Sequence, residues 1–146
     1  MRALRYKAAG GVVIDGDRVL VLRRPDRDEV RLPKGHREVG ESARETAVRE
    51  VIEESGYADI EILSDLGHQR VEFDYQGNHV IRDEHYFCMR LRSSRRIART
   101  EHELQFTPAW MDWDQALSEL TYEPEREWLR RARQAVQDAN PKGLCT

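Results

Sequence analysis

One segment of this 146-residue chain, residues 35–57, constrains the fold more than any other, because it specifies a helix together with both of its ends. Its sequence is GHREVGESARETAVREVIEESGY. Ser42 and Glu45 have the spacing of a capping box, and Gly56 suits the position that follows a helix C-terminus. The pattern therefore predicts a helix over residues 43–55. Its apolar side chains form one stripe that must pack on a core, namely Ala43, Ala47, Val48, Val51 and Ile52.

The opposite face of this helix carries three carboxylates. Glu50, Glu53 and Glu54 are spaced i, i+3 and i+4, so they share an arc of roughly 100°. Like charges at this spacing repel one another by about a few tenths of a kcal/mol per pair, and the one nearby basic residue, Arg49, lies at the edge of the arc. We interpret the face as a binding site for a divalent cation, since Mg²⁺ combines one or two carboxylates with water and substrate phosphate. The alternative is an exposed acidic helix face.

A tight loop precedes the helix. Residues 32–36 are LPKGH, and a further glycine follows at Gly40. The backbone carbonyls and basic side chains of such a loop can meet a phosphate–metal complex. The loop is not a P-loop, because the GxxxxGK[ST] pattern is absent.

The residues of this segment resemble the Nudix box. Gly35 is followed after five residues by Glu41, and after seven more by REVIEESG at residues 49–56. Tyr57 stands where the family usually has an aliphatic residue, which we interpret as a small packing change. The resemblance extends over nearly the whole chain. It implies an α/β fold, the Nudix-type α/β/α sandwich with a mixed β-sheet, and an enzyme that hydrolyses a nucleoside diphosphate linked to another group with Mg²⁺ or Mn²⁺.

Length and composition indicate a single domain over residues 1–139 with a frayed tail at 140–146. The formal net charge of −3 gives no general attraction to DNA or to an anionic membrane. No run approaches the ~20 apolar residues of a membrane span, and we see no signal peptide. Cys88 and Cys145 are too few and too far apart for a disulfide framework, and they fit a reducing compartment. We therefore expect a cytoplasmic protein.

Periodicity and turn residues predict the remaining elements. We expect strands in five segments, residues 4–14, 18–24, 58–75, 79–92 and 107–113. We expect helices over residues 114–120 and 125–139, with Asp114 as the N-cap of the first. Polar or charged loops are predicted at residues 26–29 and 93–103. The order of strands and helices argues for a mixed sheet between helices, in agreement with the resemblance.

The carboxylate face and the loop before it supply the candidate metal ligands. The resemblance adds one loop carbonyl to the three helix carboxylates, and the full set is Glu50, Glu53, Glu54, and Lys34 or Gly35. We expect Arg49 to hold Glu50 in place by a charge-assisted hydrogen bond. We expect Glu41 to hydrogen-bond the loop.

Hydrolysis also needs a carboxylate that accepts the proton of the attacking water. The helix offers Glu50 and Glu53, and the loop before the last strand offers Glu101 and Glu103. Many Nudix enzymes take a ligand or base from that later loop. We choose Glu103 as its catalytic residue, although the spacing alone leaves Glu101 open.

Two features resemble the Nudix enzymes that cleave diadenosine polyphosphates. Lys34 and His36 are placed to touch a polyphosphate chain, and Tyr75 lies 18 positions after the box, where those enzymes tend to carry a tyrosine. An aromatic ring stacked on adenine contributes about 1–3 kcal/mol. We therefore expect cleavage of a diadenosine polyphosphate, for instance to ATP and AMP. The motif EPGE of polyphosphate hydrolases is here EVGE at residues 38–41, and the proline typical of ADP-ribose hydrolases is absent.

Other substrates and one non-enzymatic role stay open. Five arginines lie within ten residues and could bind extra phosphates or an RNA 5′ end, or could simply be solvated: Arg90, Arg92, Arg95, Arg96 and Arg99. Nucleoside triphosphates, standard or oxidised, and diphosphoinositol polyphosphates are further alternatives. A non-catalytic ligand sensor is disfavoured, because the box keeps every acidic position. The sequence leaves the oligomeric state open, a homodimer included.

Overall fold

The computed structural model describes residues 2–139, so the tail predicted at residues 140–146 and Cys145 lie outside the described residues. The strands are β1 (Arg2–Asp15), β2 (Arg18–Arg24), β3 (Glu29–Arg31), β4 (Lys34–His36), β5 (Ile60–Tyr75), β6 (Asn78–Leu91) and β7 (Thr107–Asp112). The α-helices are α1 (Ala43–Ser55), α2 (Trp113–Glu119) and α3 (Glu123–Ala139). Two 3₁₀ helices complete the set, η1 (Pro25–Arg27) and η2 (Glu101–Gln105).

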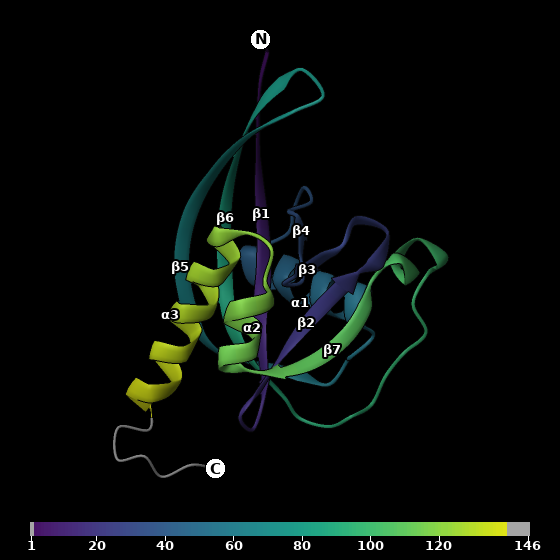
Figure 1. Ribbon diagram of the computed structural model, residues 1–146, viewed down its shortest axis with the longest axis vertical. Coiled ribbons are helices and arrows are strands. Elements are labelled where there is room, and N and C mark those ends of the chain that lie inside the picture. Colours follow the sequence, from purple (N-terminus) through teal and green to yellow (C-terminus); the bar gives the residue numbers. More distant parts are fainter. Residues whose placement is uncertain (1, 140–146) are drawn as a thin grey trace.

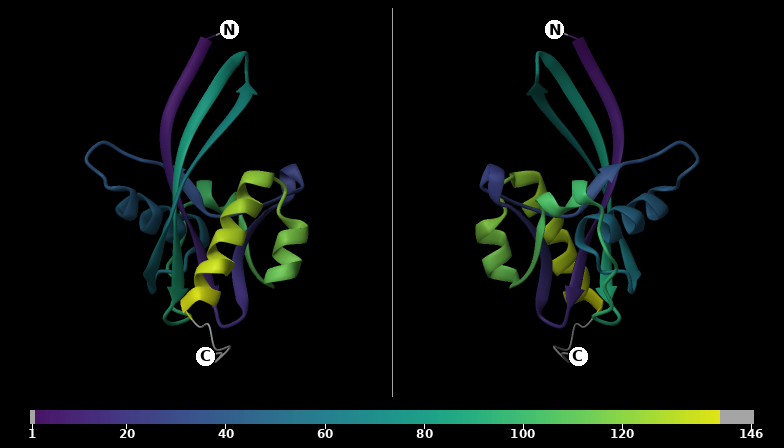
Figure 2. Two further views of the ribbon diagram at one scale, coloured as in Figure 1. Left: turned by 90° about the vertical axis from the view of Figure 1, so that its left-hand side faces the viewer. Right: turned by 90° about the vertical axis from the view of Figure 1, so that its right-hand side faces the viewer.

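The strands form one mixed sheet in the order β3-β2-β1-β6-β5, with β4 paired to β1 and β7 paired to β2. The central pair, β1 and β6, is parallel, whereas the other pairs are antiparallel. Helix α1 covers one face of the sheet, and α2 and α3 cover the other (Figures 1 and 2). This arrangement confirms the predicted α/β/α sandwich.

Two apolar cores lie on opposite faces of the sheet. Side chains alternate between the faces along each strand. Tyr86 therefore belongs to the core under α2 and α3 with Trp128, while the neighbouring Phe87 belongs to the core under α1 with Val51. Both aromatic residues are buried. The same alternation places Gly35 on one face of β4 and Lys34 and His36 on the other.

The β5–β6 hairpin and the beginning of β1 extend beyond the three helices as a long ribbon (Figures 1 and 2). Its turn lies at Gln76 and Gly77, both of which have positive φ. Within residues 2–139, no helix is long and apolar enough to cross a bilayer.

Most predicted elements are confirmed, and the helix over residues 43–55 has the predicted bounds. Both hydrogen bonds of its capping box are present, and Gly56 ends it with a φ of 81°. Asp114 is not the N-cap of α2, because the carboxylate of Asp112 accepts from the backbone N–H of Gln115 at 2.8 Å and starts the helix two residues earlier. The short strands β3 and β4 and the 3₁₀ helices were not predicted, since segments of three to five residues carry little periodicity.

Candidate active site

Gly35 allows strand β4 to lie directly against the carboxylate of Glu50. A Cβ atom at Gly35 would lie 2.0 Å from Cδ of Glu50 and 2.2 Å from its Oε1. Any other residue at this position would displace the carboxylate, so the glycine is required for the close approach. The Glu50 side chain is only 13% exposed. The Glu50 carboxylate thus occupies the position that a side chain at residue 35 would take.

Glu54 joins α1 to the same strand. Its Oε1 accepts a hydrogen bond from the backbone N–H of Lys34 at 2.7 Å, and the residue is 8% exposed. Burial, followed by the negative charge of Glu50, raises the pKa of Glu54 well above its usual range. Burial likewise raises the pKa of Glu50 to about 7. Glu53 is more open, with 45% of its side chain exposed.

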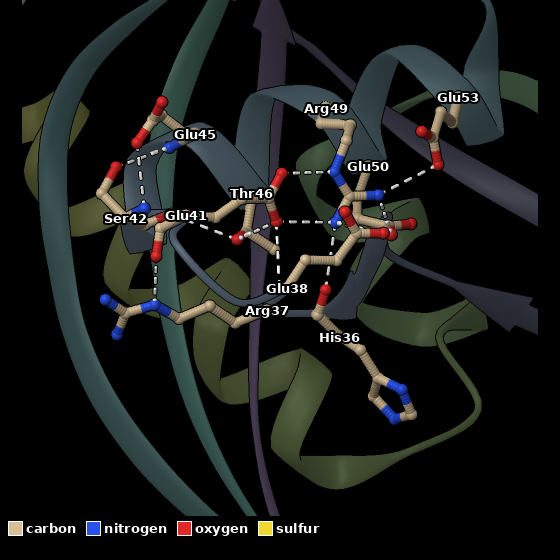
Figure 3. A network of polar contacts seen from close by, with 10 residues as sticks. All are labelled: His36, Arg37, Glu38, Glu41, Ser42, Glu45, Thr46, Arg49, Glu50 and Glu53. Carbon is tan, nitrogen blue, oxygen red and sulfur yellow. Dashed lines mark hydrogen bonds and ion pairs between the residues drawn. The ribbon is translucent and has the colours of Figure 1, made fainter.

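Arg49 supplies the positive charge within this group of acids (Figure 3). Its Nη1 donates to Glu50 at 2.8 Å and to Glu53 at 3.2 Å, and its Nη2 donates to the carbonyl of His36 at 3.1 Å. The expected contact between Arg49 and Glu50 is present. Arg49 compensates more of the acidic charge than its place at the edge of the arc predicts, because its long side chain reaches two of the three carboxylates.

Glu41 fixes Arg49 from the other side. It accepts from Nε of Arg49 at 2.7 Å and from Nη2 at 2.9 Å, and its Oε1 also accepts from the hydroxyl of Thr46 and the N–H of Glu38 (Figure 3). These hydrogen bonds, led by those from Arg49, lower the pKa of Glu41 to about 2. Glu41 therefore hydrogen-bonds the loop, as predicted, and orients the guanidinium toward the helix carboxylates.

The later loop brings Glu103 toward the same carboxylates. Helix η2 contacts α1. Burial is the largest cause of the raised pKa of Glu50 and Glu54, and the negative charge of Glu103 adds to both. Glu101 lies exposed at the start of η2. The geometry thus favours Glu103 as the acid of this loop.

The donor set suits a hard divalent cation. Carboxylate and carbonyl oxygens are the ligands that Mg²⁺ takes in proteins, usually one or two of them together with water and substrate phosphate. Within residues 2–139, no three His, Cys, Asp or Glu side chains converge as a ready-made metal cluster. Glu50 and Glu53 turn toward Arg49, and Glu54 turns toward the Lys34 amide. The buried, crowded acids nevertheless fit the cation, because it would relieve the cost of ionising them side by side.

Lys34 and His36 lie on the opposite face of β4 from Gly35. Along β1 they pair with Gly10 and Ala8, which flank the partner of Gly35. Burial and then neighbouring arginines lower the pKa of Lys34. Burial also lowers the pKa of His36, and the charge of Lys34 adds to this effect. The two proposed phosphate-contacting residues therefore share one face.

Tyr75 lies on the same face of the sheet but far along it. It ends β5 and pairs with Asn78, which in turn pairs with Arg2, whereas His36 pairs with Ala8. Six residues of β1 separate the two rows, which corresponds to roughly 20 Å. Tyr75 is 52% exposed near the tip of the ribbon. The structure does not bring it together with the carboxylates.

A group of buried ion pairs beside Lys34 was not predicted. The Nε of Arg82 donates to Glu84 at 2.7 Å, and Glu84 also accepts from the Trp128 indole at 2.7 Å. Similarly, the Nε of Arg31 donates to Glu125 at 2.8 Å. Both acids are almost fully buried. The alternation of Arg82 and Glu84 on one strand was the available signal, but only the fold shows that α3 covers that face.

The arginine cluster is largely engaged within the protein. Arg90 and Arg92 both pair with Glu61, and Arg96 lies 5.0 Å over a tyrosine ring. Arg99 donates to three backbone carbonyls. Arg90, Arg92, Arg95 and Arg96 are nevertheless exposed, so the hypothesis that they bind phosphates or RNA stays a prediction.

Comparison with known proteins identifies the family of this chain. A family model described as the NUDIX domain matches residues 4–132. A Mycobacterium tuberculosis protein (strain CDC 1551 / Oshkosh) named as the mutator protein MutT4 is 31% identical over 154 aligned residues. The alignment covers 98% of this chain, which spans only 60% of the length of that relative.

Solved structures share the fold. The Ap4A hydrolase of C. elegans aligns with a TM-score of 0.68 and 22% identity, over 91% of this chain and 99% of its own. The dihydroneopterin triphosphate pyrophosphohydrolase of E. coli aligns with a TM-score of 0.65 and 24% identity, over 86% of this chain and 92% of its own. At these identities the likeness concerns the fold alone. With the family match over most of its length and the box residues in place, the chain belongs to the NUDIX domain family.

Proposed function

We propose that this chain is a Mg²⁺- or Mn²⁺-dependent pyrophosphohydrolase that cleaves a nucleoside diphosphate linked to another group. The observation that carries the proposal is the group formed by Glu50, Glu53 and Glu54 on α1, held against the backbone of Gly35 and fixed by Arg49. A structural ion-pair network has no need of a glycine that admits a carboxylate to the backbone of a loop.

The residues have separate tasks in the proposed reaction. When bound, the divalent cation neutralises charge on the phosphoryl oxygens and lowers the pKa of the attacking water. Glu50, Glu53 and Glu54 would hold it from the helix, together with the carbonyl of Lys34 or Gly35. Arg49 keeps the Glu50 carboxylate oriented. Glu50, Glu53 or Glu103 accepts the proton of the water.

Among substrates of this class we propose a diadenosine polyphosphate. Lys34 and His36 lie together on the face of β4 opposite Gly35, and Tyr75 lies on that same face of the sheet, roughly 20 Å further along the strands and three strands across. Tyr75 would therefore meet only the far base of a ligand with an extended polyphosphate chain. The fold likeness to an Ap4A hydrolase is compatible with the proposal but does not establish it.

A nucleoside triphosphate, standard or oxidised, is the second candidate. It is favoured by the 31% identity to a protein named as a mutator protein of the MutT type. A triphosphate has no second base to reach the tip of the ribbon, so Tyr75 would then have no role in binding.

The test is a substrate panel with product identification. The purified protein is incubated with Mg²⁺ and diadenosine tri-, tetra- and hexaphosphate, ADP-ribose, nucleoside triphosphates and 5′-triphosphorylated RNA. We expect the highest kcat/KM for a diadenosine polyphosphate, and complete loss of turnover in EDTA that added Mg²⁺ or Mn²⁺ restores.

Tyr75 variants separate the two substrate classes. Loss of stacking in Tyr75→Ala should raise KM for the dinucleotide by about 10-fold, whereas Tyr75→Phe keeps the ring and should behave as the wild type. A wild-type preference for triphosphates, together with no effect of Tyr75→Ala, would refute the dinucleotide proposal and leave the metal site intact.

A further inference from the structure

We propose that Arg99 is a positioning residue that holds Glu103 against the carboxylate face of α1. This inference rests on the proposed function, because it concerns the same metal site. Nη1 of Arg99 donates to the carbonyls of Glu54 at 3.1 Å, Glu103 at 3.2 Å and Phe106 at 2.7 Å. One guanidinium therefore ties the end of the catalytic helix to both ends of the segment that carries Glu103.

The C-terminus of α1 needs such a partner. The last carbonyls of an α-helix have no partner within the helix, and they favour nearby positive charge. The last turn of α1 contains no basic residue of its own. Arg99 reaches the carbonyl of Glu54, and the backbone N–H of Ile97 donates to the carbonyl of Gly56 at 2.8 Å. The segment before η2 is thus joined to the helix end that bears Glu54.

Helix η2 has few other means of holding its position. None of its five residues is buried, and Thr100 at its N-cap makes no side-chain capping hydrogen bond. Its internal backbone hydrogen bonds, from Glu103 to Thr100 and from Phe106 to Glu103, fix its shape but not its place on α1. Buried Phe106 anchors the following residue. Arg99 therefore supplies the polar link that sets the place of Glu103 relative to Glu54.

The place of η2 agrees with this role. Helix η2 contacts α1, and Glu103 is partly buried whereas its neighbours His102 and Leu104 are exposed. Without Arg99, the segment would keep only the backbone hydrogen bond of Ile97 and the buried Phe106 ring, so the place of Glu103 beside the carboxylate face would be less fixed. In this inference Glu103 would bind the cation together with the carboxylates of α1, and partners that orient metal-binding groups usually contribute about 10–100-fold to metal affinity.

A double-mutant cycle on Mn²⁺ binding tests the inference without substrate. The dissociation constant is measured by electron paramagnetic resonance of free Mn²⁺ for the wild type, Arg99→Ala, Glu103→Gln and the double variant. We expect Arg99→Ala to weaken binding about 10-fold. In the Glu103→Gln background, Arg99→Ala should weaken Mn²⁺ binding by less than a further twofold. The exposed Arg95 in the same loop is the matched control, and Arg95→Ala should bind Mn²⁺ as the wild type does.

Turnover and rescue provide a second readout. Arg99→Ala should lower kcat while KM stays within twofold of the wild-type value, since Lys34, His36 and Tyr75 are untouched. Arg99→Lys keeps the charge on a shorter side chain with different donor geometry, and it should give an intermediate loss. If Arg99→Ala does not fold, judged by circular dichroism, the same cycle is carried out with Arg99→Lys.

The outcomes separate the two proposals. The positioning role would be overturned if Arg99→Ala bound Mn²⁺ with wild-type affinity. It would also be overturned if Arg99→Ala weakened Mn²⁺ binding equally in the wild-type and Glu103→Gln backgrounds. Both results would leave the hydrolase proposal standing. A wild-type protein that binds no Mn²⁺ would overturn the proposed function and this inference with it.

Discussion

Substitution of Glu50 by glutamine should stabilise the metal-free protein at neutral pH. Burial raises the pKa of Glu50 to about 7, whereas an unperturbed glutamate titrates near 4.5. Between these two values the folded protein keeps a proton that the unfolded chain loses. The folded state then binds more protons, so the free energy of unfolding falls as the pH rises through this window.

The magnitude follows from the size of the shift. Each pKa unit corresponds to about 1.4 kcal/mol, so the difference between 4.5 and about 7 costs the wild type about 3 kcal/mol above pH 7. Glutamine does not titrate, and its carbonyl oxygen can still accept the hydrogen bond from Nη1 of Arg49. Glu50→Gln should therefore match the wild type at pH 4.5 and exceed it by up to about 3 kcal/mol at pH 8.

Urea unfolding in EDTA from pH 4.5 to 8 measures this difference directly. Glu53→Gln is the matched control, because the Glu53 side chain is 45% exposed and water already solvates its carboxylate. Addition of Mg²⁺ at pH 8 should stabilise the wild type and have a smaller effect on Glu50→Gln. Parallel curves for the wild type and Glu50→Gln across this range, or a less stable variant at pH 8, would show that Glu50 is not strained in the metal-free protein.

Two further substitutions separate catalysis from packing. Glu54→Gln keeps the volume of the side chain and removes one charge from the metal face. Activity should fall by several orders of magnitude, while the Tm should stay unchanged or rise slightly. A large loss of Tm with retained activity would mean that the acids are structural. Tyr57→Phe removes the hydroxyl that accepts a hydrogen bond from the Trp110 indole at 3.1 Å. Urea unfolding should show a free energy of unfolding lower by about 1 kcal/mol, with kcat unchanged. Equal stability of the variant and the wild type would show that this hydrogen bond does not contribute.

The sequence predicted the central helix and its carboxylate face because both depend on local spacing. The capping box, Gly56 and the i, i+3, i+4 acids all act within a few turns of one helix. Helix spacing alone did not predict the full set of partners of Arg49, which include Glu41 just before the helix. The sequence prediction also treated Tyr57 as a small packing change, whereas its hydroxyl bonds to Trp110 from a different strand.

Features that depend on contacts between distant segments could not be predicted. The choice between Glu101 and Glu103 depends on where η2 lies on α1, and Arg99 fixes that through backbone carbonyls that carry no sequence pattern. The pair of Arg31 and Glu125 joins residues 94 positions apart. Such pairs become visible only when α3 covers the sheet.

The parallel pairing of β1 with β6 has a consequence for the order in which the chain folds. Each β1 residue from Arg2 to Ile14 pairs with one 76 positions later, from Arg2 with Asn78 to Ile14 with Arg90. During synthesis, β1 therefore waits for its central neighbour until about 76 further residues have been made. Contacts so distant in sequence slow folding and leave strand edges exposed meanwhile. Mutations that weaken this ladder should thus reduce the yield of folded protein before they affect the metal site.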